Sequence, residues 1–307
     1  MSYTFGKTLL VINPASQLGH GDIAGKRAEE LLRMKFDASS SLEVVRTQGP
    51  NDAVEIGKDA QGYDSILVLG GDGVINEVAN GLMELPFDKR PVMGVLPVGS
   101  GNDYAKTLHM SYQIDQAVEQ LFSAKPQAAD VGLCNGRYFV ETLSFGLDAA
   151  IALDTVERRR RTGKTGLALY GAASAYQLSH HRDTHDFIVS VDGSAPRHEQ
   201  MILFAVQIGP SYGGGFCVCP EASISDGIFD ICVARPPIGV VEAALMFLFA
   251  RNGHHTHFKK LELSRAKSLV LDFDHDVKVQ IDGEPLPSRH YEISSVPHAL
   301  RVLIAQN

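Results

Sequence analysis

Apolar runs without polar alternation recur in the first part of the chain, at residues 8–12, 66–69 and 92–96. Such runs are typical of parallel strands that are covered on both faces. After the second run, apolar residues return at the i, i+3, i+4, i+7 spacing of a helix with one buried face, namely Ile75, Val78, Ala79 and Leu82. A short strand is also expected at 42–47 and a helix at 23–36. The pattern predicts a doubly wound, Rossmann-like α/β domain.

The pattern changes after Pro126. Short apolar or alternating segments separated by turns follow at 138–140, 187–191, 202–208, 228–234, 269–273 and 277–281, which predicts a β-rich domain. A chain of 307 residues with 44% hydrophobic and 21% charged residues has enough core for two domains. We expect an α/β domain over 1–128 and a β-rich domain over 129–297. A return of residues 298–307 to the first domain is left open.

A glycine-rich loop, Gly70 to Gly73, joins the second apolar run to its helix. Glycines let the backbone come close to a ligand, and the free N–H groups of a helix start favour an anion such as phosphate. Asp72 stands inside this loop and would repel phosphate oxygens unless a divalent cation lay between them. The loop therefore predicts phosphate and Mg²⁺. The alternative is a tight turn in which Asp72 is a solvated cap.

Two further loops follow apolar runs, one beginning with Asn13 and Pro14 and the other spanning residues 98–103. Loops at the carboxyl ends of neighbouring parallel strands share the crevice in which open α/β sheets bind ligands. The three loops are therefore expected to meet at one site. Asn13–Pro14 alone is equally consistent with a simple turn, and Asp103 with a helix cap.

The segment Gly-Gly-Asp-Gly followed by Asn76, Glu77, Asn80 and Gly81 resembles the catalytic signature of the diacylglycerol kinase and bacterial lipid kinase family. Residues 97–105 resemble the second signature of that family. The resemblance implies an ATP-dependent lipid kinase whose second domain is an antiparallel β-sandwich with a lipid-facing cleft. Two positions depart from the pattern: Val74 replaces a threonine, and Gln17 replaces a glycine of the first loop.

The resemblance also assigns roles to individual residues. Asp72 and Asp103 would organise Mg²⁺ and water, and Glu284, just beyond the turn Asp282–Gly283, would accept the proton of the lipid hydroxyl. A structural Mg²⁺ would bind Asp226 and the carbonyls of Ser223 and Ile228, although Asp226–Gly227 by itself indicates a hairpin turn. The residues expected at the nucleotide are Asn13, Pro14, Ser16, Thr47, Gly71, Asp72, Gly73, Asn76, Glu77 and Ser100.

Other features limit the partners and the location. A formal charge of −8 argues against general nucleic-acid binding. The four cysteines lack zinc spacing and are expected to be reduced thiols. The sequence shows no signal-peptide pattern. The apolar stretch 240–250 predicts a core helix, with membrane contact as the second interpretation, and is too short to span a bilayer, so we expect a cytoplasmic protein. We interpret residues 158–161, four consecutive arginines, as a solvated surface or as an attraction for anionic headgroups.

The expected partner is a lipid substrate at the membrane surface, with transient peripheral membrane contact, no nucleic acid, and a homodimer left open. The preferred acceptor is diacylglycerol or a similar lipid. Sphingosine, phosphatidylglycerol and NAD remain alternative acceptors. A second alternative, suggested by Val74 and Gln17, is a catalytically weak lipid-binding regulator.

Overall fold

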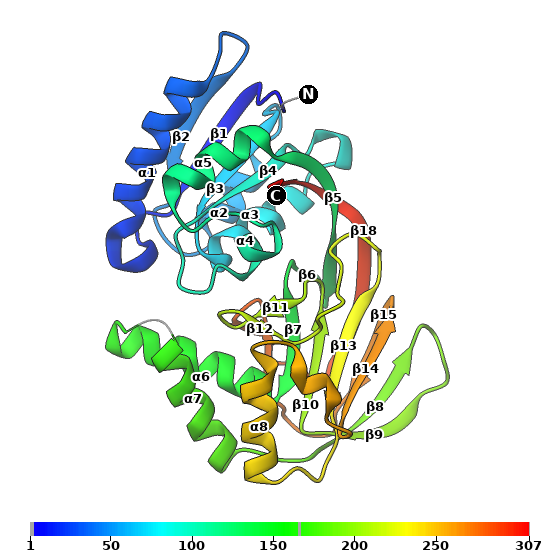
Figure 1. The fold of residues 1–307 in the computed structure, drawn as a ribbon. Coiled ribbons are helices and arrows are strands. Elements are labelled where there is room, and N and C mark those ends of the chain that lie inside the picture. Colours follow the sequence, from blue (N-terminus) through cyan, green and yellow to red (C-terminus); the bar gives the residue numbers. More distant parts are fainter. Residues whose placement is uncertain (1–2, 165–166, 307) are drawn as a thin grey trace. The chain divides into compact units, whose positions relative to one another are not determined.

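The computed structural model describes residues 3–164 and 167–306. The chain forms two compact units, Met1–Asp130 with His298–Asn307, and Val131–Pro297 (Figure 1). The polypeptide passes between the units within two strands, β5 (Lys125–Cys134) and β18 (His290–Ile304).

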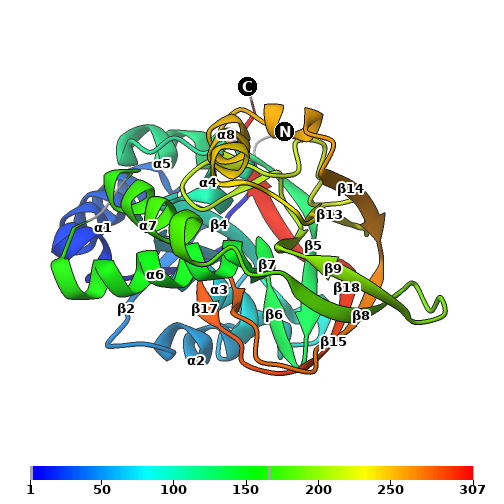
Figure 2. The same cartoon turned by 90° about the horizontal axis from the view of Figure 1, so that it is seen from below.

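The first unit is a parallel sheet with helices on both faces. Its strands run in the order β2-β1-β3-β4, and β18 joins the β4 edge in parallel through the pair Val302 and Met93. Helices α1 and α5 pack together on one face, and α2 and α3 pack on the other (Figures 1 and 2). The elements are β1 (Lys7–Ile12), α1 (Ser16–Lys35), β2 (Ser41–Arg46), α2 (Asp52–Lys58), β3 (Ser65–Gly70), α3 (Asp72–Met83), η1 (Phe87–Lys89), β4 (Val92–Pro97), α4 (Asp103–Thr107) and α5 (Ile114–Ser123).

The central strands explain the position of the site. Every residue of β3 and β4 is buried, as expected for apolar strands between two helical layers. Their carboxyl ends lie side by side, because Gly70 pairs with Pro97 in the parallel register. The loops that follow both strands are therefore neighbours.

The second unit is an antiparallel β-sandwich with helices. One sheet has the order β14-β13-β10-β7-β16-β17, and β18, β15, β8 and β9 form the other together with β5 and β6. Its strands, besides β5 and β18, are β6 (Arg137–Phe139), β7 (Thr142–Gly146), β8 (His185–Val191), β9 (Arg197–Met201), β10 (Leu203–Gln207), β11 (Ser211–Tyr212), β12 (Phe216–Cys217), β13 (Phe229–Ala234), β14 (Leu261–Ala266), β15 (Ser268–Asp272), β16 (Val279–Ile281) and β17 (Glu284–Pro285).

Aromatic side chains fill the space between the two sheets. The Phe145 ring lies 5.0 Å from that of Tyr291 and 5.9 Å from that of Phe273, and Phe187 lies 5.6 Å from Phe273. Large edge-to-face and stacked rings of this kind stabilise a core beyond their buried area. The predicted fold class, an α/β nucleotide-binding domain followed by an antiparallel β-sandwich, is confirmed.

Three helices of the second unit cover its six-stranded sheet: α6 (Leu147–Thr162), α7 (Leu167–His180) and α8 (Val240–Ala250), with the turn η2 (His254–His257) after α8 (Figure 2). The sequence pattern predicted α8 but not α6 or α7. The apolar residues of these two helices do not form one long stripe. In addition, four consecutive arginines stand just before the last residue of α6, Thr162, so the sequence pattern did not indicate an amphipathic helix there. The arginines lie in the last turns of α6, where cations are favourable at the helix carboxyl end.

Candidate functional site

Two glycine loops touch backbone to backbone in the first unit. A Cβ atom added to Gly99 would lie 2.4 Å from the Cα of Gly71, and one added to Gly71 would lie 3.0 Å from the Cα of Gly99. A side chain at 99 does not fit unless the Gly71 backbone moves, and one at 71 would displace the Gly99 backbone by a few tenths of an ångström. The first loop leads directly into the start of α3, where the N–H groups of a helix favour an anion such as phosphate.

Two carboxylates converge beside the same loops. A Cβ placed on Gly101 would lie 2.8 Å from Oδ2 of Asp72 and 3.1 Å from Oδ2 of Asp103, so both oxygens face one point. The Tyr104 amide lies 3.4 Å from Oδ1 of Asp72, and Asp103 is buried. Burial first, and then the charges of Asp103 and Asp72, raise the pKa of Tyr112.

This donor set fits a hard divalent cation. Mg²⁺ in phosphoryl-transfer sites is bound through one or two carboxylates together with water and substrate phosphates. Asp72 and Asp103 provide two carboxylates, and Gly101 leaves open the place that a larger residue would fill. Among the described residues, however, no cluster of three or more His, Cys, Asp or Glu side chains could hold a metal ion. The remaining ligands would therefore be water and phosphate oxygens.

The first loop reaches this site in an unusual backbone conformation. Gln17 and Leu18 have φ values of 45° and 58°, and Gly19 follows at 96°. Gln17 thus adopts the left-handed conformation at the position where the family pattern has glycine, which costs on the order of 1–2 kcal/mol for a non-glycine residue. Its Nε2 donates a hydrogen bond of 2.5 Å to the Gly99 carbonyl, and this contact ties the first loop to the second signature.

The structure brings several further predicted nucleotide residues to the loops. A Cβ on Gly70 would lie 3.3 Å from both the Cβ of Asn13 and the Oγ of Ser16. The Thr47 amide donates to the Ile12 carbonyl at 2.9 Å, so Thr47 follows β2 directly beside Asn13. Pro14 lies between Asn13 and Ser16 in the same loop. These residues form one cluster at the carboxyl ends of β1, β2 and β3.

The other predicted nucleotide residues lie close to the loops but show no contact that fixes a role. Gly73, Asn76 and Glu77 are on the first turns of α3. Asn80 donates to the Asn76 carbonyl at 2.9 Å. Ser100 is half-buried between the two glycines of its loop. Their contacts with a nucleotide stay predictions.

In the second unit, Glu284 stands at an exposed strand end. Gly283, with φ of 86°, donates its amide to Oε1 of Gln280 at 2.7 Å. The Asp282 carboxylate accepts the amides of Val140, Glu141 and Thr142. The turn is therefore held firmly, while Oε1 of Glu284 lies 3.8 Å from the exposed Arg160 guanidinium. A base placed here would be accessible and only weakly paired.

Asp226, also in the second unit, has the contacts of a turn residue. Its Oδ1 accepts the Ile228 amide at 3.2 Å, and its Oδ2 lies 3.8 Å from the Arg265 guanidinium. Gly227 has a positive φ of 75°, as a tight turn requires. The Ser223 hydroxyl accepts the Ser225 amide. A cation held by Asp226 and the carbonyls of Ser223 and Ile228 stays a prediction, and it would compete with Arg265 for the carboxylate.

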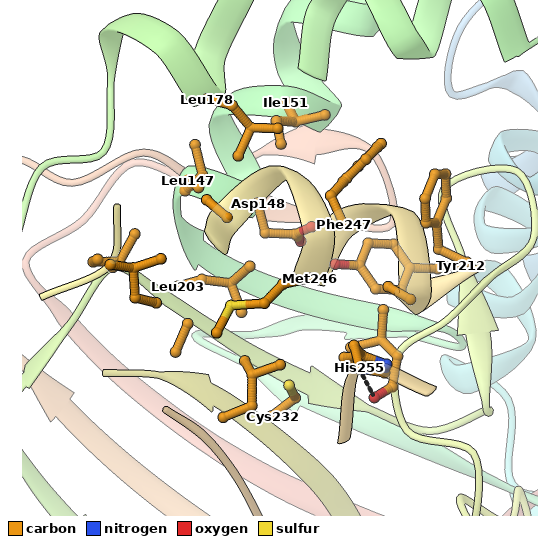
Figure 3. A pocket seen from close by; sticks show the side chains of 18 of the residues that line it. Leu147, Asp148, Ile151, Leu178, Leu203, Tyr212, Cys232, Met246, Phe247 and His255 are labelled. Carbon is orange, nitrogen blue, oxygen red and sulfur yellow. Dashed lines mark hydrogen bonds between the residues drawn. The ribbon is translucent and has the colours of Figure 1, made fainter. Parts of the chain in front are cut away.

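An apolar pocket lies between the helices and the six-stranded sheet of the second unit (Figure 3). About 720 Å³ of space that protein atoms leave free lies among its walls and at its opening. Three rings form one wall, since Phe216 lies 5.0 Å from Tyr170 and 4.5 Å from Phe247. The other apolar lining residues are Leu147, Ile151, Leu178, Ile202, Leu203, Val218, Ala234, Ile238, Ala243, Met246, Ala250 and Leu261.

Five lining residues of this pocket carry polar groups: Asp148, Tyr170, Tyr212, Cys232 and His255. Nε2 of His255 lies 3.0 Å from the Val218 carbonyl (Figure 3). Burial raises the pKa of Asp148, and the hydroxyl groups of Ser144 and Tyr212 act in the opposite direction and lower it. Burial and the neighbouring Asp148 raise the pKa of Tyr212 well above its usual value. The interior therefore favours uncharged groups.

The resemblance implied a lipid-facing cleft in the second domain, but the sequence did not identify the residues that line this pocket. Its walls come from positions 147–261, in the helices α6, α7, α8 and η2, the strands β10 to β14 and the turns between them. The apolar content of residues 240–250 was a signal that could have indicated the pocket, because Ala243, Met246 and Phe247 of this segment line it.

Models of known protein families match the sequences of both units. The family model described as the diacylglycerol kinase catalytic domain matches residues 7–134. The model described as the YegS C-terminal NAD kinase beta sandwich-like domain matches residues 141–304. Proteins named "Probable lipid kinase YegS-like" from Yersinia pestis (strain Pestoides F) and Yersinia pseudotuberculosis serotype O:1b (strain IP 31758) are each 29% identical over 309 residues, covering 98% of this chain and 97% of theirs.

The crystal structure of a diacylglycerol kinase from Bacillus anthracis str. Sterne is similar with a TM-score of 0.80 and 24% identity, covering 99% of this chain and 98% of that chain. Because the two chains are only 24% identical, this similarity is evidence for the fold alone.

Proposed function

Because the chain belongs to the diacylglycerol kinase catalytic-domain family and is a lipid kinase, we propose that it transfers the γ-phosphoryl group of ATP to the hydroxyl of diacylglycerol or a similar lipid. The observation that carries the proposal is the convergence of Asp72 and Asp103 beside the two touching glycine loops. Phosphoryl transfer needs mostly positioning and charge neutralisation, which such a site can supply.

The roles of the residues follow from their places. The amides at the start of α3 would bind phosphate oxygens, and Asn13, Ser16 and Thr47 would contact the nucleotide beside them. Asp72 and Asp103 would hold Mg²⁺, which neutralises phosphate charge when it is bound. Glu284 would take the proton of the lipid hydroxyl, which is poorly nucleophilic while protonated.

The pocket of the second unit supports an acceptor with an aliphatic chain. Its lining is predominantly apolar, and the residues that form it include no lysine or arginine. Burying an aliphatic chain stabilises binding by about 0.8 kcal/mol for each CH₂ group removed from water. Such a pocket suits the hydrocarbon part of a lipid better than the dinucleotide NAD.

Helix α8 offers a surface for transient membrane contact. No helix within the described residues is long and apolar enough to cross a membrane. One face of α8 lines the pocket, while Val241 and Leu248 on another face are 73% and 63% exposed. Large exposed apolar side chains on a helix of this kind favour the interface of a bilayer. We propose that the enzyme meets its lipid there.

ATP turnover with a panel of acceptors tests the proposal. Purified protein is assayed with Mg²⁺ and ATP on vesicles containing diacylglycerol, phosphatidylglycerol or sphingosine, and separately with NAD in solution. Phosphorylated diacylglycerol is the expected product. Preferential phosphorylation of another acceptor would overturn the substrate assignment, and lipid binding without turnover of any acceptor would favour the regulator.

A further inference from the structure

A carboxyl group stands deep in the apolar pocket of the second unit. Asp148 lies on the first turn of α6 and is only 6% exposed. Figure 3 shows its side chain inside the pocket, with the Tyr212 hydroxyl beside it. A carboxyl is rarely buried without a specific partner.

The hydrogen bonds around Asp148 satisfy only part of this group. Nε2 of Gln280 donates to Oγ of Ser144 at 2.9 Å, so the Ser144 hydroxyl is available to donate in turn to Asp148. The Tyr212 hydroxyl lies beside the carboxyl and acts, like that of Ser144, to lower its pKa. Oδ2 of Asp148 is nevertheless buried without a hydrogen-bond partner in the described part of the chain.

The pocket around Oδ2 gives it no cation. The positions that line the pocket hold neither lysine nor arginine, and His255 is directed to the Val218 carbonyl. Burial raises the pKa of Asp148, so the neutral acid, which can both donate and accept a hydrogen bond, is favoured. A neutral polar group on a ligand matches these surroundings, and a hydroxyl can pair with either form of the carboxyl.

We infer that Asp148 selects lipids whose aliphatic chain carries a hydroxyl group, by hydrogen bonding that hydroxyl inside the pocket. The inference rests on the proposed function for its ligand class. A plain chain would fill the same space but would leave Oδ2 unpaired, and an unpaired buried polar atom weakens binding. A site built to bind a hydroxyl discriminates against analogues that lack it.

Direct binding tests the inference without requiring catalysis. The probes are 1-stearoylglycerol and a series of its derivatives in which one hydroxyl is moved along the acyl chain, measured by calorimetry without ATP. The wild type should bind the best hydroxylated probe on the order of tenfold more tightly than the plain one. Asp148→Asn should keep the preference, because an amide still donates and accepts. Asp148→Leu should abolish it.

Met246→Leu is the matched control, since it changes the pocket wall without changing its polarity, and it should keep the preference. Equal binding of all probes by the wild type would overturn the inference, as would a preference that survives in Asp148→Leu. If the leucine variant does not fold, Asp148→Ala, which also removes the carboxyl, takes its place and should likewise lose the preference. Failure of the kinase proposal is seen separately, as absence of lipid phosphorylation in the turnover assay.

Discussion

The glycine loops of the first unit and the pocket of the second are built in opposite ways. The loops place polar groups and backbone amides at short, fixed distances after buried strands, and Gly71 and Gly99 meet because β3 and β4 are adjacent and in register. The pocket collects apolar residues from elements that are far apart in sequence and encloses one carboxyl. The proposed phosphate chemistry is therefore encoded locally, while the proposed choice of lipid depends on the packing of the whole unit.

Asp72→Asn should remove catalysis most completely. The change deletes a charge that is needed only when Mg²⁺ and phosphate are present, so turnover should fall by about 10²- to 10³-fold, the range for a lost electrostatic group. The amide keeps an acceptor for the Tyr104 N–H, and the melting temperature should barely move. Asp88→Asn, an exposed acid of the same unit, is the control. Near-wild-type turnover would remove Asp72 from the mechanism.

Glu284→Gln tests the second unit in the same assay. Size and hydrogen bonding are kept but basicity is lost, so lipid phosphorylation should fall about 10²-fold or more. ATP affinity, measured on the same preparation, should be unchanged. Arg160→Gln is a useful companion, since the 3.8 Å contact with Glu284 is exposed and its loss should matter little. Full turnover in the glutamine variant would return Glu284 to a turn residue.

Gly99→Ala and Gly73→Ala separate close packing from ligand access. The new methyl at 99 would meet the Gly71 backbone at 2.4 Å, so the free energy of unfolding should fall by about 1–3 kcal/mol. The methyl at 73 meets nothing within 4 Å, so stability should hold or rise while ATP binds more weakly if phosphate approaches this amide. Denaturant titration and calorimetry measure both effects. Equal stabilities would mean that the loops can move apart.

Asp148→Asn should change how stability depends on pH. The folded-state pKa of Asp148 is raised above the ordinary value of 3.8, so its neutral form stabilises the fold below that value. This contribution is lost as pH rises through the folded-state pKa. The asparagine variant should therefore gain stability relative to the wild type as pH increases from about 4. Parallel denaturation curves at every pH would show that Asp148 ionises freely in the fold.

Asp226→Ala is expected to give the smallest effect. If Mg²⁺ binds this turn, the cation stabilises the folded state by mass action, and the Mg²⁺-dependent rise in melting temperature should be smaller in the variant. Activity should fall only indirectly. Identical Mg²⁺ titration curves for wild type and variant would leave Asp226 as the partner of Arg265 alone.

Local signals in the sequence were sufficient for one of the two regions. Runs such as 66–69 identify buried strands because both faces are covered, and the glycines that follow indicate a loop. The Gly-Gly-Asp-Gly signature indicated the family, and the comparisons confirmed it. The conformation of Gln17 was not predictable, because its left-handed backbone depends on a hydrogen bond to Gly99, a residue 82 positions away.

The sequence by itself determined the central strands and glycine loops of the first unit, the fold class and the kinase family, because these depend on periodicity and on residues close together in the chain. Only the tertiary structure revealed α6 and α7 and the pocket beneath them, and only it distinguished Asp148 from an ordinary acidic residue at a helix start. The physical reason is that burial and the supply of hydrogen-bond partners are set by distant segments. Only folding brings Ser144 and Tyr212 close to Asp148, and Gln280 close to Ser144.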